Sequence, residues 1–432
     1  MSAQTCPIDA ADEFRPYSPR MREDPYRAYA KLREERPVEW MPVADTGYWA
    51  VSRHADAVTV LRSADFGAGA AHLDAFESVF DAEGTESKLP SLMRRWFLFQ
   101  DPPEHTFLRG TVARAFSPPA IRERRERIEG LVAELFDPLG TEGVVDVVPA
   151  FARPLPVRVI GELFGLPSEG SEELAAWSLA LTRATEPFTT RRRLQQASDA
   201  LDRWVEYFQR EFTRRDSEPT ADLLTTLLEE EFDGRRLTRD EVMATIVMMF
   251  LGGHESTLLL LTTCIEMLAT CDGLRESLRA EPDRIRSFVE EALRLESPIQ
   301  IAVRRALRDV ELGGRQLRQG DQVVVLVGSV NRDPEHFVEP DEMQVGRDAR
   351  HLAFGYGVHY CVGAALARLE AEVVVDRVVR EFTRLEIVDP RPRRRPSFTG
   401  RGYVSLHVAY SRDLSPSRAT GSSTCRVSEA VR

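Results

Sequence analysis

One stretch of the sequence carries most of its information about fold and chemistry, Phe354-Gly355-Tyr356-Gly357-Val358-His359-Tyr360-Cys361-Val362-Gly363. The residues after it, Ala364 to Glu370, are mostly strong helix formers, so we expect Cys361 to lie at a helix N-terminus. Backbone N–H groups and the helix dipole favour an anion there, and the thiolate is the form of cysteine that binds a metal. Gly355 and Gly357 permit a tight bend and a close approach of the backbone to a flat cofactor. The stretch therefore predicts a metal-binding thiolate.

This stretch resembles the haem-binding signature of the cytochrome P-450 family, Phe-Gly-x-Gly-x-His/Arg-x-Cys-x-Gly, at every fixed position. The resemblance implies haem b (iron protoporphyrin IX) as the cofactor, Cys361 as the proximal ligand of the iron, and O2 as co-substrate. Thiolate ligation favours cleavage of the O–O bond. The resemblance also implies contacts to the cofactor from Phe354, Gly355, His359 and Gly363. The alternative for a lone cysteine is a buried structural residue after a glycine turn, which the complete pattern disfavours.

A long apolar segment lies upstream of this stretch. Thr238-Arg239-Asp240-Glu241 has the pattern of a capping box, which predicts a helix that runs to about Thr270 and is roughly 48 Å long. Because the segment is apolar nearly all round, we expect the helix to cross the middle of the molecule. Its centre, Gly252-Gly253-His254-Glu255-Ser256-Thr257, combines glycines, an acid and hydroxyls that are poor choices for a buried helix.

This centre resembles the Ala/Gly-Gly-x-Asp/Glu-Thr signature of the same family, in which the helix widens over the haem where O2 binds. The resemblance implies that Gly252 contacts the haem and that Glu255 and Ser256 are the acid and the alcohol that deliver protons. Thr257 adds a further catalytic hydroxyl. Ser256 stands where the family usually has threonine. The alternative is a kinked core helix without a catalytic role.

The propionates of the haem have candidate ligands elsewhere in the sequence. His105 and Arg109 stand four residues apart after Pro102-Pro103, so they share one face of a predicted helix. The family has a matching His-x-x-x-Arg pair that contacts a propionate, and by the same resemblance Arg304 and His359 are further propionate ligands. Without the resemblance, the first pair would be interpreted as a solvated basic face.

A second set of family-like residues is expected to be structural. Glu291-Ala292-Leu293-Arg294 places an acid and a base three residues apart on a helix that begins near Pro282. It resembles the Glu-x-x-Arg motif that locks the core of the family. Arg347 is a candidate partner for Glu291.

The substrate pocket is expected to be mainly apolar, with six candidate lining residues: Met248, Met249, Ile301, Ala302, Val303 and Thr399. Residues 64–93 have weak periodicity, and a long segment without regular structure is usually functional, so we interpret them as one wall of the pocket. By resemblance, residues 180–195 form its roof. The basic run from Pro390 to Pro396 is interpreted as a solvated loop and not as a nucleic-acid site.

The fold is expected to be mainly α with small β-sheets, a cytochrome P-450 fold in a single large domain. The domain spans residues 21–410, after an N-terminal extension (1–20) and before a disordered, Ser/Thr/Arg-rich tail (411–432). Residues 121–214 look helical throughout, with breaks near 140–143, 165–167 and 185–190. Further expected elements are a helix at 24–35, a hairpin of strands 38–41 and 48–52, strands at 310–312 and 323–326, a helix from residue 364 to about 380, and a last sheet of strands 384–388 and 404–408.

Composition limits the ligands, the covalent cross-links and the cellular location that we expect for this protein. A net charge of −12 argues against nucleic-acid binding. Five cysteines at unrelated spacings form no disulfide framework. Charged and polar residues interrupt the segment 242–269, so it predicts a buried helix and not a membrane span. With no targeting signal recognised near residue 1, we expect a cytoplasmic protein, and a monomer.

Together these features predict a haem-thiolate monooxygenase. It would insert one oxygen atom of O2, by hydroxylation or epoxidation, into a small organic substrate such as a secondary metabolite. No flavin, iron–sulfur or nicotinamide domain is recognised, so electrons are expected from a separate ferredoxin and ferredoxin reductase. Two alternatives stay open: oxidative coupling or ring formation without oxygen insertion on the same fold, and a non-enzymatic haem sensor or electron carrier.

Overall fold

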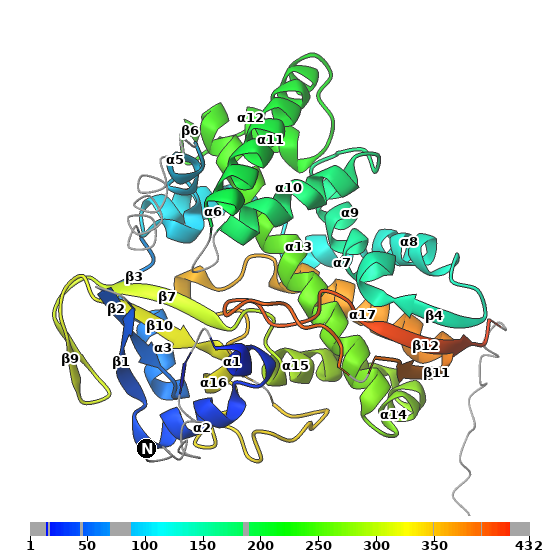
Figure 1. The fold of residues 1–432 in the computed structure, drawn as a ribbon. Coiled ribbons are helices and arrows are strands. Elements are labelled where there is room, and N and C mark those ends of the chain that lie inside the picture. Colours follow the sequence, from blue (N-terminus) through cyan, green and yellow to red (C-terminus); the bar gives the residue numbers. More distant parts are fainter. Residues whose placement is uncertain are drawn as a thin grey trace, which may run out of the picture.

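The computed structural model describes residues 14–15, 18–43, 46–69, 88–184, 190–348, 350–389 and 391–414. Helices dominate these ranges (Figure 1). The α-helices are α1 (Pro19–Glu23), α2 (Tyr26–Glu35), α3 (His54–Arg62), α5 (Leu89–Met93), α6 (Glu104–Ala113), α7 (Pro118–Arg122), α8 (Arg125–Phe136), α9 (Pro154–Leu163), α10 (Ser171–Ala184), α11 (Arg191–Ser217), α12 (Leu223–Glu229), α13 (Arg239–Thr270), α14 (Leu274–Ala280), α15 (Ile285–Leu295), α16 (Val327–Val330) and α17 (Ala364–Glu381). Shorter helical turns are η2 (Phe97–Phe99), η3 (Val148–Ala152), η4 (Pro282–Arg284) and η5 (Gly357–His359).

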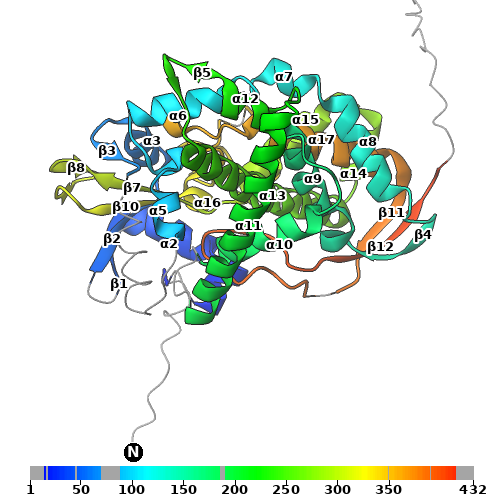
Figure 2. The same cartoon turned by 90° about the horizontal axis from the view of Figure 1, so that it is seen from above.

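The strands form small sheets at the edges of this helical body. They are β1 (Val38–Val43), β2 (Thr46–Val51), β3 (Phe66–Gly67), β4 (Glu142–Asp146), β5 (Glu231–Phe232), β6 (Arg235–Arg236), β7 (Ile301–Ala306), β8 (Val310–Leu312), β9 (Arg315–Leu317), β10 (Gln322–Leu326), β11 (Phe382–Ile387) and β12 (His407–Arg412). A five-stranded sheet has the order β1-β2-β10-β7-β3, and a three-stranded sheet has the order β11-β12-β4. The two sheets lie on opposite sides of α13 (Figures 1 and 2). The prediction of a mainly α fold with small β-sheets is therefore confirmed.

Helix α13 crosses the middle of the molecule, as predicted (Figure 2). Its N-cap is Thr238, whose side chain accepts a hydrogen bond from the backbone of Glu241 while the Glu241 side chain bonds back. Helices α9, α10, α15 and α17 all pack against it. It is long and apolar enough to cross a membrane, but 78% of its most apolar window is buried inside the protein, as in the core helix of a globular fold. This central helix and α17 provide the frame for the site.

The predicted hairpin and the predicted helix at 24–35 are both present, since β1 pairs antiparallel with β2 after α2. One element differs from the expectation. Residues Glu142–Asp146 form strand β4, where the sequence suggested only a break between helices. Val144 and Val145 pair there with Ala409 and Val408 of β12, a partner far along the chain. The last strand also begins at His407 and not at Val404.

The Glu291–Arg294 pair is a buried ion pair that ties α15 to the segment before the cysteine loop. Both Arg294 Nε and Nη2 donate to the Glu291 carboxylate at 2.8 Å, and Arg347 Nε donates to it at 3.1 Å. Arg294 also donates to the backbone oxygen of Asn331 at 2.9 Å. The predicted partnership of Arg347 with Glu291 is confirmed.

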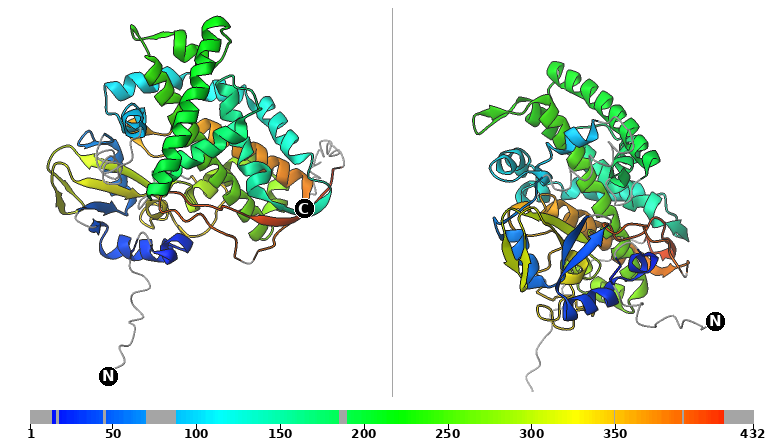
Figure 3. Two further views of the ribbon diagram at one scale, coloured as in Figure 1. Left: turned by 45° about the horizontal axis from the view of Figure 1, so that its top comes forward. Right: turned by 60° about the vertical axis from the view of Figure 1, so that its left-hand side comes forward.

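Some expectations fall outside the described residues. These are most of the N-terminal extension (residues 1–13 and 16–17), most of the tail (415–432), residues 70–87 of the predicted pocket wall and residues 185–189 of the predicted roof. The described ends of that wall form β3 and α5, and the described ends of the roof belong to α10 and α11. Figure 3 shows the long green helix α11 at the top of the molecule in both views.

Candidate active site around Cys361

The cysteine loop is shaped by its two glycines. Gly355 and Gly357 have φ values of 71° and 73°, in the left-handed region that favours glycine. A Cβ on Gly357 would lie 2.6 Å from the backbone oxygen of Leu61, so this glycine also lets the loop pack on the end of α3. The backbone N–H of Cys361 then donates to the carbonyl of Phe354 at 2.9 Å. This bond closes the loop and places Cys361 just before α17, as predicted.

The Cys361 side chain is accessible, yet the protein around it desolvates the thiol. Burial raises its pKa, while the backbone N–H groups of Gly363 and Ala364 and the charges of Arg109 and Arg368 lower it. The surroundings of this thiol therefore disfavour its charged form, although the side chain is accessible. A bound metal cation deprotonates a coordinating thiol outright, and these donors would then stabilise the thiolate.

Four basic side chains gather beside this loop, and we call them the cation cluster: His105 and Arg109 from α6, Arg304 from β7 and His359 from η5. The rings of His105 and His359 are 4.1 Å apart. Within the described part of the chain, neither ring nitrogen of His105 nor Nε2 of His359 has a hydrogen-bond partner, although all three are buried. Sequence reasoning had predicted all four residues as one set, and the structure brings them together.

The cation cluster lacks a compensating negative charge, so an anion would be stabilised there. Burial, and then the charge of Arg304, lower the pKa of His359 to about 3. Burial and the charge of Arg109 also lower the pKa of His105. Burial lowers the pKa of Arg304, which the negative charge of Asp101 offsets in part. Two carboxylates, such as the propionates of haem, would supply both the missing charge and acceptors for the unpaired donors. The residues present therefore fit that group.

Two faces of α13 have different surroundings at its centre. A Cβ added to Gly252 would meet nothing within 4 Å, whereas one on Gly253 would meet Ile160 Cδ1 at 2.9 Å. Residues four apart share a helical face, so Met248 and Ser256 lie with Gly252 on the open face. Met249 and Thr257 lie with Gly253 on the packed face. The structure thus separates residues that were predicted to act together.

The hydroxyls of this segment bond back to their own helix. Ser256 Oγ donates to the carbonyl of Gly252 at 2.8 Å, and Thr257 Oγ1 donates to the carbonyl of Gly253 at 2.8 Å. Such bonds satisfy the hydroxyls inside the helix. Ser256 is half-exposed and Thr257 is buried, so Ser256 is the hydroxyl that borders open space.

Glu255 is buried and forms an ion pair with Arg395, a residue that sequence reasoning missed. Its other oxygen lies 3.5 Å from His254 Nε2. The basic run 390–396 was interpreted as a solvated loop, and this was wrong for Arg394 and Arg395. Both are half-buried and pair with glutamates of α13. The only signal in the sequence was the presence of unexplained acids in an apolar helix.

The predicted pocket residues of β7 do not share one face. Side chains alternate along a strand, so Ala302 lies with Arg304, whereas Ile301 and Val303 point to the other side. There they pack in a cluster with Phe14, Met21, Tyr29 and other apolar residues. Thr399 lies in the loop between β11 and β12, and its carbonyl accepts a hydrogen bond from the backbone N–H of Gln300 at 2.8 Å.

Comparisons with known proteins identify the family of the chain. A family model described as Cytochrome P450 matches residues 185–403. The chain is 34% identical to cytochrome P450 107B1 of Saccharopolyspora erythraea, over 84% of this chain and 89% of that protein. It is 33% identical to 6-deoxyerythronolide B hydroxylase of the same organism, over 84% of this chain and 90% of the relative. The crystal structure of CalO2 superposes with a TM-score of 0.85 at 32% identity, covering 93% of this chain and 99% of that one.

Proposed function

The chain belongs to the cytochrome P450 family, and on this premise we propose that it is a haem-thiolate monooxygenase of a small organic substrate. Members of the family use haem and O2, and the relatives include a hydroxylase of 6-deoxyerythronolide B. We propose haem b as the cofactor and a secondary metabolite as the substrate, hydroxylated or epoxidised. The observation that carries the proposal is the cation cluster beside the accessible Cys361, because it fits a dicarboxylate cofactor next to a thiolate.

The chain offers a residue for each part of cofactor binding. Cys361 would hold the iron, and the cation cluster would hold the propionates. Phe354, Gly355 and Gly363 belong to the same loop, and Gly252 leaves room on the opposing helix. When bound, the haem supplies the activation of O2.

Protons would reach the site through α13. Ser256 Oγ borders open space and can exchange its bond to the Gly252 carbonyl for one to a guest molecule. Glu255 would resupply the proton of Ser256 from the interior side of the helix, with Thr257 as a neighbouring hydroxyl. Met248 and Ala302 are the candidate pocket residues that lie on the faces of Gly252 and Arg304, respectively. Electrons would come from a ferredoxin and its reductase, acting on a cytoplasmic monomer.

Isotope-labelled O2 tests the proposal. In turnover with a ferredoxin and its reductase, we expect one labelled oxygen atom in the product. Ser256→Ala should lower the fraction of consumed electrons that appears in product by about 100-fold or more, which is the lower end of what a positioned proton donor contributes. Ser256→Thr, which keeps the hydroxyl, should retain the wild-type fraction. A coupled or cyclised product without label would instead support oxidative coupling, and binding of substrates without any turnover would support a sensor.

Retention of haem tests the cation cluster. Arg304→Gln removes a buried partner of the propionates, and truncating one side of such a pair costs about 2–5 kcal/mol. We therefore expect haem to transfer to apomyoglobin at least tens of times faster than from the wild type. Arg305→Gln is the matched control, because Arg305 lies on the other face of β7 and bonds to the Gly320 carbonyl at 3.2 Å. Equal transfer rates for the two variants would contradict the assignment of Arg304.

A further inference from the structure

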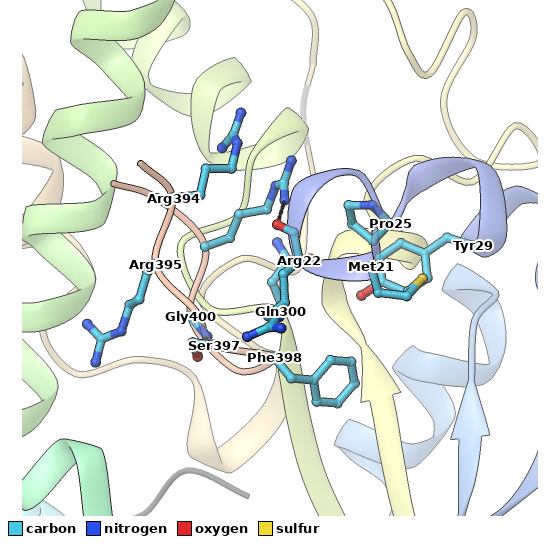
Figure 4. Close-up of a pocket in the computed structure, with 12 residues that line it drawn as sticks. Met21, Arg22, Pro25, Tyr29, Gln300, Arg394, Arg395, Ser397, Phe398 and Gly400 are labelled. Carbon is cyan, nitrogen blue, oxygen red and sulfur yellow. Dashed lines mark hydrogen bonds between the residues drawn. The ribbon is translucent and has the colours of Figure 1, made fainter. Parts of the chain in front are cut away.

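A cleft of about 430 Å³ opens between α5, α11 and the N-terminal end of α13, and we call it the α5 cleft. Figure 2 shows α5 beside α11 and α13, and α5 contacts both of them. The volume falls within the range of roughly 300–1,000 Å³ that is usual for sites of small organic molecules. By contrast, the hollow beside Gln300 in Figure 4 measures about 10 Å³, which is space for one water molecule. Of these two cavities, the α5 cleft is the one with room for an organic ligand.

The floor of the α5 cleft is apolar, and its rim is charged. The floor consists of Leu92 from α5, Leu201, Val205 and Phe212 from α11, and Met243 from α13. Three exposed cations line the rim, and each pairs with an aspartate: Lys88 with Asp202 at 3.6 Å, Arg95 with Asp240 at 3.6 Å, and Arg239 with Asp216 at 2.7 Å. Because each of these cations has its own carboxylate, the rim offers no uncompensated charge to an ionic ligand. A neutral molecule would bury its apolar body against the floor and keep its hydroxyl or carbonyl groups at the rim.

The floor of the α5 cleft lies on the side of α13 that faces away from the open face of Gly252 and Ser256. Met243 precedes Gly252 by nine residues, and each residue turns the helix by about 100°, so the two lie half a turn apart around the axis. They are also roughly 13 Å apart along the axis. A molecule on the floor of the cleft would therefore be separated by α13 from the space that Ser256 borders.

Helix α5 would respond to a ligand in the cleft. Leu92 lines the cleft, whereas Leu89 and Met93 are buried in the main hydrophobic cluster. With five residues, α5 is too short to be stable by itself, so its contacts decide where it lies. A ligand on the floor would add contacts between α5 and α11, which the exposed pair of Lys88 and Asp202 joins at one end. Local opening of α5 would then be rarer, and its backbone N–H groups would exchange more slowly with solvent.

We propose that the α5 cleft is a second ligand-binding site, which takes a neutral, mainly apolar organic molecule with hydroxyl or carbonyl groups and holds α5 against α11. Its volume and apolar floor fit such a molecule, and its paired rim charges fit a neutral one. The site lies apart from the proposed haem site, so its ligand is bound in addition to the substrate. This inference does not depend on the proposed monooxygenase function. Absence of oxygen insertion would contradict that function and leave the cleft unaffected.

Hydrogen–deuterium exchange of the haem-loaded protein, measured by mass spectrometry, locates the site. Progesterone serves as the probe because it is neutral and mostly apolar and carries carbonyl groups. We expect it to slow exchange in residues 88–95 and 239–243, and a concentration series gives its Kd. Val205→Trp fills the floor with a far larger side chain. Since even one methylene too many in an apolar pocket costs about 10–200-fold, the Kd should rise at least about tenfold in this variant.

Two further variants make the test specific. Arg203→Trp places the same side chain on α11 at an exposed position about 200° around the helix from Val205, and the Kd should stay that of the wild type. Val205→Asn nearly keeps the volume but makes the floor polar, so it should also raise the Kd, and it decides the matter if Val205→Trp does not fold. The proposal is overturned if the wild type shows no protection at these segments. It is equally overturned if the protection persists in the Val205 variants, because the probe would then bind elsewhere, or if Arg203→Trp loses it to the same extent.

Discussion

Cys361→Ala is expected to abolish the strongly red-shifted Soret band of the reduced carbon monoxide complex and to lower product formation at least about 100-fold. Removal of groups that merely orient a metal ligand already costs about 10–100-fold, so loss of the ligand itself should cost more. The physical reason is that the thiolate donates electron density to the iron, and alanine leaves only a neutral or solvent-derived ligand. Spectra of the purified reduced protein with carbon monoxide, taken beside product yields, check both effects.

The control for this prediction is Cys271→Ala. Cys271 is half-buried at the end of α13, and burial raises the pKa of its thiol. Its replacement tests whether the loss of any accessible thiol produces the same spectrum. We expect the control to keep the red-shifted band. A wild-type protein that binds haem but lacks this band would show that Cys361 does not ligate the iron as a thiolate.

Much of the frame was predictable because its signals are local. The capping box at Thr238 and the apolar run after it define α13, and the structure begins that helix at Arg239. The glycines of the cysteine loop occupy left-handed conformations, which agrees with the tight bend that was predicted for them. In each case the residues that determine the conformation are within a few positions of one another, so the conformation can be predicted from the sequence alone.

The features that the sequence did not predict depend on contacts between residues that are far apart in the chain. Nothing near Arg395 in the sequence indicates that it meets Glu255, because the two residues belong to elements that are far apart in the chain, the loop between β11 and β12 and the centre of α13. Strand β4 was overlooked for the same reason, since β12 completes it from the other end of the domain. Ile301 and Val303 are a different case. The two-residue period of a strand already separates them from Arg304, and only the choice of the buried face needed the structure.

Glu291→Gln is expected to produce the largest loss of stability among the substitutions considered. The carboxylate is 1% exposed and accepts hydrogen bonds from Arg294, from Arg347 and from the backbone N–H of Gln344 at 2.9 Å. Breaking a buried pair leaves its partner charge uncompensated and costs about 3–5 kcal/mol. This is a large share of the roughly 5–15 kcal/mol that stabilises a typical domain. Urea unfolding at pH 7, followed by far-ultraviolet circular dichroism, measures the difference.

The pH dependence of the same variant distinguishes loss of a charge from loss of packing. Burial raises the pKa of Glu291, but the hydrogen bonds from Arg294, Gln344 and Arg347 and the charge of Arg294 outweigh it and hold that pKa below its ordinary value. A lowered pKa in the folded state contributes stability above the unfolded-state value of about 4.3, and this contribution is lost as pH falls through the folded pKa. The gap between wild type and Glu291→Gln should therefore be full at pH 7 and shrink below about pH 4. Glu276→Gln, at an exposed carboxylate 3.9 Å from Arg275, should show almost no gap at any pH. A gap for Glu291→Gln that stays constant down to acid pH would mean that shape, and not charge, makes this carboxylate necessary.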